Sequence, residues 1–125
     1  MNWWTQNKAQ EVTSADQFYQ MLNGELKEKF VVIDFYMQYC KWCYFIMEDF
    51  NRIIEDFTGW YGADQVAFLK VDGQIIWELA QRYQVMYFPA FIAIAPKNAE
   101  AKSVFKNPQR NYETLKMWLS EVIGD

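Results

Sequence analysis

Histidine is absent from the 125 residues of the chain, and this absence excludes several common kinds of active site. Without an imidazole the chain has no histidine general base, no Ser/His/Asp or Cys/His triad and no histidine-ligated metal. The chain has two cysteines, Cys40 and Cys43. Their spacing suits reversible pairing and is too close to staple a fold. Chemistry is therefore expected at this CxxC pair.

Long apolar runs and stretches of one charge are also missing. The net charge is -4 with acids and bases interleaved, so no basic stripe favours nucleic acid as a partner. No segment approaches the roughly 20 apolar residues of a membrane span, and residues 1–4 lack the features of a signal peptide. We expect a soluble monomer, cytoplasmic by default, or secretory if the chain is trimmed from a precursor.

The chain also lacks a Gly/Ser or Pro tract that would mark an internal linker. With 125 residues, of which 52% are hydrophobic and 19% aromatic, it has enough apolar side chains for one sizeable core. The sequence therefore predicts a single domain over residues 1–125, in which residues 1–12 form a possible N-terminal extension.

Helical and strand patterns alternate along the chain. The expected elements are a helix over 14–24, a strand over 30–37, a helix from about 40 to 57, a strand over 66–71, a helix over 76–83, strands over 88–95 and 103–106, and a last helix from about 111 to 122. This order predicts an α/β domain with a mixed sheet that helices cover on both faces.

Several motifs in this order are similar to those of a known family. A strand containing Asp34, followed after six residues by the first cysteine of a CxxC that opens a helix, resembles the thioredoxin superfamily. Residues 68–72 and 79–90 resemble the catalytic domains of protein disulfide isomerases, and the likeness extends from about residue 18 to 122. The resemblance implies a thioredoxin fold, with a central mixed β-sheet flanked by helices on both faces.

The residues around the cysteines depart from the family pattern. The usual Trp-Cys-Gly-Pro-Cys or Trp-Cys-Gly-His-Cys is here the run from Tyr39 to Cys43, with Lys41 and Trp42 between the cysteines. A dipeptide at this place tunes the balance between dithiol and disulfide, so the family's redox potential cannot be transferred. The lack of an imidazolium that would stabilise the Cys40 thiolate favours a moderately reducing couple, whereas the charge of Lys41 weakly favours a more oxidising one. The direction of electron flow stays open.

The two cysteines have different expected tasks. Cys40 would lie at a helix N-terminus, where unpaired N–H groups and the helix dipole stabilise a thiolate, and Lys41 adds a cation. We therefore expect Cys40 to be the nucleophile. Cys43, one turn further into the helix, would resolve the mixed disulfide by attacking Cys40.

The resemblance also implies roles for three charged residues. Asp34 is similar to the family's buried acid, which relays a proton beneath the second cysteine, and burial would raise its pKa. Lys70 resembles the lysine that pairs with this acid, and Arg110 resembles a mobile arginine that approaches Cys43. The alternatives are a strand-end acid facing water and two ordinary surface cations.

Three further residues are candidates for substrate binding. Pro89 resembles the cis-proline that faces the disulfide, where the backbone of Phe88 would bond to an extended substrate; the alternative is a trans proline at a sheet edge. Trp42 would either contact an apolar substrate or shield the disulfide.

The leading hypothesis is a thiol-disulfide oxidoreductase that reduces, forms or isomerises protein disulfides through Cys40 and Cys43. Its partners would be proteins with disulfides or thiols, and a reductase or glutathione. It would use no cofactor beyond its own disulfide and no metal, because one chain supplies two soft ligands where zinc or iron-sulfur sites need four; a metal shared by two chains is less favoured. The alternative is a docking or structural module of the same fold with little catalytic activity.

Overall fold

The computed structural model of the protein describes residues 2–124. The chain begins with a 3-10 helix, η1 (Trp3–Gln6), and a short strand, β1 (Gln10–Glu11). The later elements are α1 (Ala15–Asn23), β2 (Phe30–Tyr36), α2 (Lys41–Tyr61), β3 (Val66–Asp72), α3 (Trp77–Arg82), β4 (Ala90–Ile94), β5 (Ala101–Val104) and α4 (Tyr112–Gly124).

The strands form one mixed sheet of five in the order β1-β3-β2-β4-β5. β1 and β2 both pair in parallel with β3, whereas β4 is antiparallel to β2 and β5 is antiparallel to β4. The continuous apolar and β-branched run of β2 suits the centre of the sheet, because a strand buried on both faces needs no polar alternation. The expected mixed sheet is confirmed.

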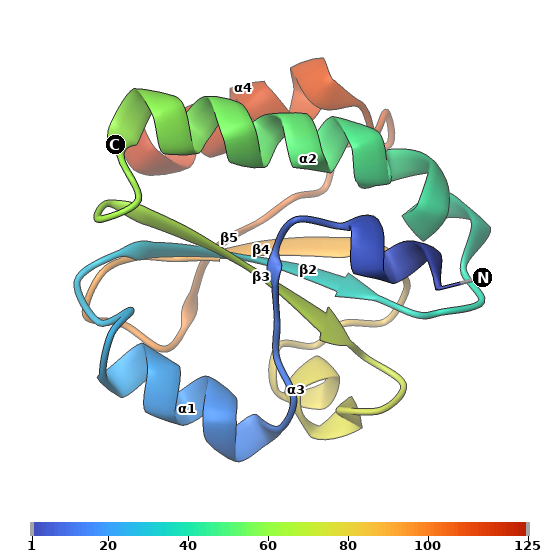
Figure 1. Cartoon of the computed structure of the whole chain (residues 1–125), viewed down its shortest axis with the longest axis horizontal. Coiled ribbons are helices and arrows are strands. Elements are labelled where there is room, and N and C mark those ends of the chain that lie inside the picture. Colours follow the sequence, from blue (N-terminus) through green and yellow to red (C-terminus); the bar gives the residue numbers. More distant parts are fainter. Residues whose placement is uncertain (1, 125) are drawn as a thin grey trace.

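Helices cover both faces of this sheet (Figure 1). α2 and α4 lie on one face over a core that includes Phe50, Phe57 and Leu119. α1 and α3 lie on the other face over a core that includes Phe18 and Leu79. The α/β thioredoxin fold expected from the sequence is thus the observed architecture. The carboxyl ends of the parallel strands β2 and β3 lie at the same end of the sheet, and α2 begins there.

Most expected boundaries hold to within two residues, and the exceptions have local causes. α2 continues past the expected end near residue 57, through Gly59 to Tyr61, and its C-cap is Gly62, whose φ of 91° suits glycine. β4 begins after Pro89 rather than at Phe88, and β5 lies two residues earlier than expected, opposite an irregularity between Ala93 and Ile94.

Residues 2–12 pack onto the domain. β1 joins the sheet edge beside β3, and the backbone N–H of Val12 donates to the carbonyl oxygen of Lys70 at 3.0 Å. The N–H of Lys8 donates to the side chain of Asn51 in α2 at 2.7 Å. The segment therefore contacts the sheet and α2 along its length.

Candidate functional site

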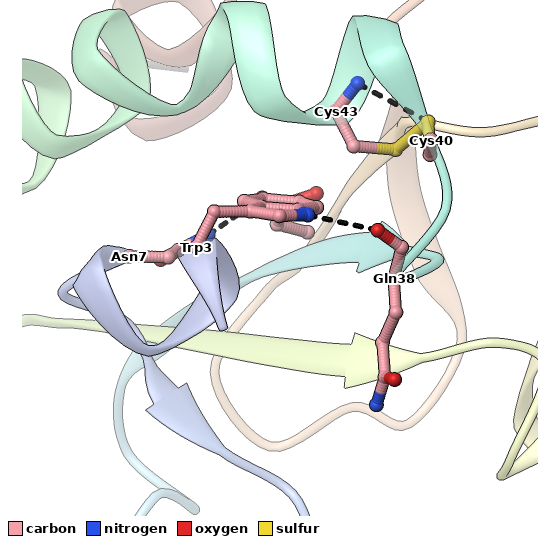
Figure 2. The surroundings of a disulfide bond; sticks show 6 residues. Trp3, Asn7, Gln38, Cys40 and Cys43 are labelled. Atoms are coloured by element: carbon pink, nitrogen blue, oxygen red, sulfur yellow. Dashed lines mark hydrogen bonds between the residues drawn. A yellow bond between two sulfur atoms is a disulfide. The ribbon is translucent and has the colours of Figure 1, made fainter. Parts of the chain in front are cut away.

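Cys40 and Cys43 form a disulfide at the N-terminus of α2, with their Cα atoms 5.2 Å apart (Figure 2). Cys40 is the N-cap residue, with extended backbone angles, and its Sγ accepts the N–H of Cys43 at 3.1 Å. Cys40 is half-buried, whereas Cys43 is only 3% exposed. The sulfur at the helix N-terminus is therefore the more accessible of the two, as expected for an attacking cysteine.

Exposed aromatic side chains lie between the two cysteines and directly after them. Trp42 is 63% exposed, and its ring meets that of Phe45 edge to face at 5.8 Å. The ammonium of Lys41 lies 5.6 Å from the centroid of the Trp42 ring, within the range of a cation–π contact. Lys41 therefore lies over aromatic rings on the surface beside the disulfide.

A groove of about 590 Å³ lies next to these rings. Its lining residues come from α2, from the segment before β4 and from the segment before α4: Trp42, Phe45, Ile46, Tyr87, Phe88, Pro108 and Arg110. All are apolar or aromatic except Arg110, whose guanidinium lies 5.4 Å from the centroid of the Tyr87 ring. The groove can hold a bulky apolar side chain with a guanidinium at its rim.

The Phe88–Pro89 peptide bond is cis, as the sequence resemblance implies. Phe88 and Cys40 both pack against a small buried cluster of Trp3, Tyr36, Cys43 and Met47. Gly73 makes room for its ring, because a Cβ atom at Gly73 would lie 2.3 Å from Cε1 of Phe88. Phe88 is thereby held between the groove and the disulfide.

Asp34 lies on β2 and is 3% exposed, so the alternative of an acid facing water is wrong. Burial raises the pKa of its carboxyl to about 7, against smaller lowering effects from Asn7 and Lys70. The amide of Asn7 donates to Oδ2 at 2.9 Å, whereas Oδ1 has no partner among the described residues. Asp34 can therefore take up and release a proton near neutral pH.

Lys70 is buried beside Asp34 on the neighbouring strand, but the expected direct pairing is wrong. Its ammonium donates to the carbonyl oxygens of Trp4 at 2.8 Å and Asn7 at 2.6 Å, and no ion pair joins it to Asp34 within residues 2–124. The N-terminal segment offers these acceptors, so Lys70 acts on Asp34 only through space.

Arg110 is exposed and lies at the groove, over Tyr87. Its approach to Cys43 stays a prediction. Cys40, Trp42 and Phe88 thus lie near one another at the surface with Cys43 buried beside them, while Asp34 and Lys70 lie in the interior.

Sequence reasoning missed the contribution of η1. Trp3 is buried below the disulfide, and its indole N–H donates to the carbonyl oxygen of Gln38 at 2.8 Å (Figure 2). Its ring meets those of Tyr36 and Tyr44 edge to face, both at 5.9 Å. The pair Trp3-Trp4 was visible in the sequence as a packing signal, but nothing local indicated which residues it would cover.

In the part of the chain that the structure describes, no group of three or more His, Cys, Asp or Glu side chains is arranged to hold a metal ion. Over the same residues, no helix combines the length and apolar character that crossing a membrane requires.

Comparisons with known proteins agree with this geometry. The sequence profile of the thioredoxin family matches residues 9–121. A thioredoxin of Malassezia sympodialis is 35% identical over 83 residues, which are 66% of this chain and 72% of that protein. An H-type thioredoxin of Oryza sativa subsp. indica is 35% identical over 85 residues, 68% of this chain and 64% of that protein.

Solved structures show the same fold. The thioredoxin of Fasciola hepatica superposes with a TM-score of 0.73 at 23% identity, covering 90% of this chain and 97% of that one. Human ERp44 gives a TM-score of 0.77 at 17% identity, covering 92% of this chain and 29% of that one.

A thioredoxin fold with a CxxC disulfide at the start of its α2 helix defines a class of redox proteins. The chain belongs to the thioredoxin family, and it is a thiol-disulfide oxidoreductase.

Proposed function

We propose that the protein reduces disulfides in other proteins, and that it does so in two steps. The Cys40 thiolate attacks one sulfur of the substrate disulfide, forming a mixed disulfide and releasing the first substrate thiolate. Cys43 then attacks the sulfur of Cys40, which releases the second substrate thiolate and leaves the Cys40–Cys43 disulfide observed here. Two electrons pass to the substrate, and a reductase or glutathione must return them.

The accessibility of the two sulfurs supports this assignment. Cys40 is half-buried at the helix N-terminus, whereas Cys43 is 3% exposed, so a protein substrate reaches Cys40 first. The N–H of Cys43 already donates to Sγ of Cys40, and this bond favours a thiolate there. The single observation that carries the proposal is therefore the Cys40–Cys43 pair at the start of α2.

Asp34 is the proposed proton acceptor for the second step. Cys43 must lose a proton before it attacks, because the thiolate is the nucleophile. Asp34, with its pKa raised to about 7 by burial, is ionised in a large fraction of molecules at neutral pH and can accept that proton. Lys70 favours the ionised form through space.

Reduction is the proposed direction because few groups stabilise the Cys40 thiolate. A strongly oxidising couple needs a strongly stabilised reduced form. Within the described residues, Cys40 accepts one backbone N–H bond and has the helix N-terminus, and the chain contains no histidine. The charge of Lys41 is directed over the rings of Trp42 and Phe45.

The surface around Cys40 supports a protein substrate. Large apolar side chains are exposed on both sides of the cysteines and along the groove: Tyr39, Trp42, Tyr44, Phe45 and Tyr87. Such a surface favours binding of apolar side chains. A substrate chain passing the disulfide would place a side chain in the groove beside Trp42, and the backbone of Phe88 would bond to it as a strand.

Reduction of insulin by dithiothreitol, followed as turbidity, tests the proposal. The protein should accelerate the reaction, Cys40→Ser should abolish the acceleration, and Cys43→Ser should accumulate a mixed disulfide with insulin that mass spectrometry detects. Equal rates with and without the protein would overturn the proposal. Insulin binding that survives the double replacement, without catalysis, would instead support a docking module.

A further inference from the structure

We propose that Asn7 is a positioning residue for the resolving step, because its side-chain amide holds the Asp34 carboxyl and stabilises the ionised form that accepts a proton. The inference rests on the proposed function, in which Asp34 takes the proton of Cys43. Asn7 touches no reacting atom, so it acts entirely through Asp34.

The orientation of the Asn7 amide is fixed by its neighbours. Asn7 is 4% exposed, and its Oδ1 accepts the backbone N–H of Ala9 at 2.9 Å. Since that N–H requires an acceptor, Nδ2 must be the atom that faces Asp34, and it donates to Oδ2 at 2.9 Å. A reversed amide would oppose two acceptors across this contact. Asn7 therefore presents a donor to the carboxyl.

No other side chain replaces this donor among the described residues. Lys70 is occupied by two backbone carbonyls, one of which belongs to Asn7 itself. Oδ1 of Asp34 has no partner. The amide of Asn7 is thus the one side-chain hydrogen bond that the buried carboxyl receives, and a bond to an ionised acceptor is stronger than one to a neutral acceptor.

The other charged and titratable groups around Asp34 act through space. Lys70 on β3 favours its ionised form and Glu11 on β1 opposes it. Tyr36 on β2 donates to Glu11 at 2.8 and 3.0 Å, and Asp72 on β3 opposes the ionisation of Glu11. Of these charges only Lys70 opposes the effect of burial on the pKa of Asp34. The hydrogen bond from Asn7 and the charge of Lys70 are therefore the two interactions that favour ionised Asp34.

Losing this bond should raise the pKa of Asp34 beyond the value of about 7 that burial gives it. Hydrogen bonds to charged groups correspond to a shift of about one unit or more. A rise of one unit would reduce the ionised fraction at pH 7 about fivefold, and the resolving rate should fall by the same factor.

Two variants test this inference. Asn7→Leu and Asn7→Ala each remove the amide donor without placing a second carboxyl beside Asp34. Gln6→Leu is the matched control, because the exposed side chain of Gln6 lies next to Asn7 in the sequence and forms no hydrogen bond with the described residues. Folding of each variant is checked first by urea unfolding, so that Asn7→Ala carries the test if Asn7→Leu fails to fold.

The first readout is the pKa of Asp34 in the oxidised protein, from the ¹³C shift of its carboxyl carbon. The second is the pH dependence of the resolving rate, from single turnovers of a mixed disulfide on Cys40. We expect both to move upward by about one unit in a folded Asn7 variant and to stay unchanged in Gln6→Leu. An unmoved pKa, or a rate profile that does not follow it, would overturn the inference. If the proposed function itself were wrong, the unmodified protein would fail to reduce insulin, which is a different result from an unmoved pKa in the Asn7 variants.

Discussion

Replacement of Asp34 by asparagine should make the oxidised protein more stable at alkaline pH. The folded protein holds the pKa of this carboxyl at about 7, against an ordinary value of 3.8. Between these two values the folded chain keeps a proton that the unfolded chain releases, so the free energy of unfolding falls as pH rises. A difference of about three pKa units corresponds to about 4 kcal/mol.

The amide in Asp34→Asn never ionises, so this pH-dependent loss disappears. Well below pH 3.8 the carboxyl of the unmodified protein is neutral in both states, and the two proteins should differ little. Between pH 4 and pH 8 the variant should gain up to about 4 kcal/mol over the unmodified protein. The new side chain can still accept the amide of Asn7 through its oxygen, so packing changes little.

Urea unfolding followed by tryptophan fluorescence from pH 4 to pH 8 measures this gain. The disulfide stays oxidised throughout, so that neither cysteine titrates. Groups that do not interact with Asp34 contribute equally in both proteins and cancel in the difference, whereas the repulsion between Glu11 and Asp34 is part of the measured effect. A constant difference between the two proteins over this pH range would refute the perturbed pKa of Asp34.

Three further replacements test the packing around the site and the start of α1. Trp3→Phe removes the indole N–H donated to Gln38, and urea unfolding should show a loss of about 1 kcal/mol or more; an unchanged midpoint would contradict the anchoring role. Gly73→Ala places a Cβ against the Phe88 ring, so KM for insulin should rise, and an unaltered KM would show that the ring is free to move. Ser14→Ala removes the side-chain cap of α1 and should cost about 1 kcal/mol in the same unfolding assay, with no loss expected only if another group caps the helix.

The elements with strong local patterns could be predicted from the sequence. The strand over 30–37, the helix from about residue 40 and the helix over 14–24 each depend on patterns within a short stretch of chain, and the structure has them as β2, α2 and α1. The CxxC motif and Asp34 could be assigned to a helix start and a buried strand for the same reason.

The N-terminal segment could not be predicted in this way. β1 has two residues, which is too short for any periodicity to show. The bond from Asn7 to Asp34 joins residues 27 apart, and the bond from Lys70 to Trp4 joins residues 66 apart. Such contacts depend on how the sheet places β1 beside β3, and they explain why the expected Lys70–Asp34 pairing was wrong.

The equilibrium reduction potential of the Cys40/Cys43 couple tests the proposed reductase most directly. It can be measured against glutathione by tryptophan fluorescence, since Trp42 and Trp3 lie beside the disulfide. We predict a value near that of thioredoxin, about -270 mV. A value near about -180 mV, which is typical of protein disulfide isomerase, would contradict the reductase and identify a protein that forms or rearranges disulfides.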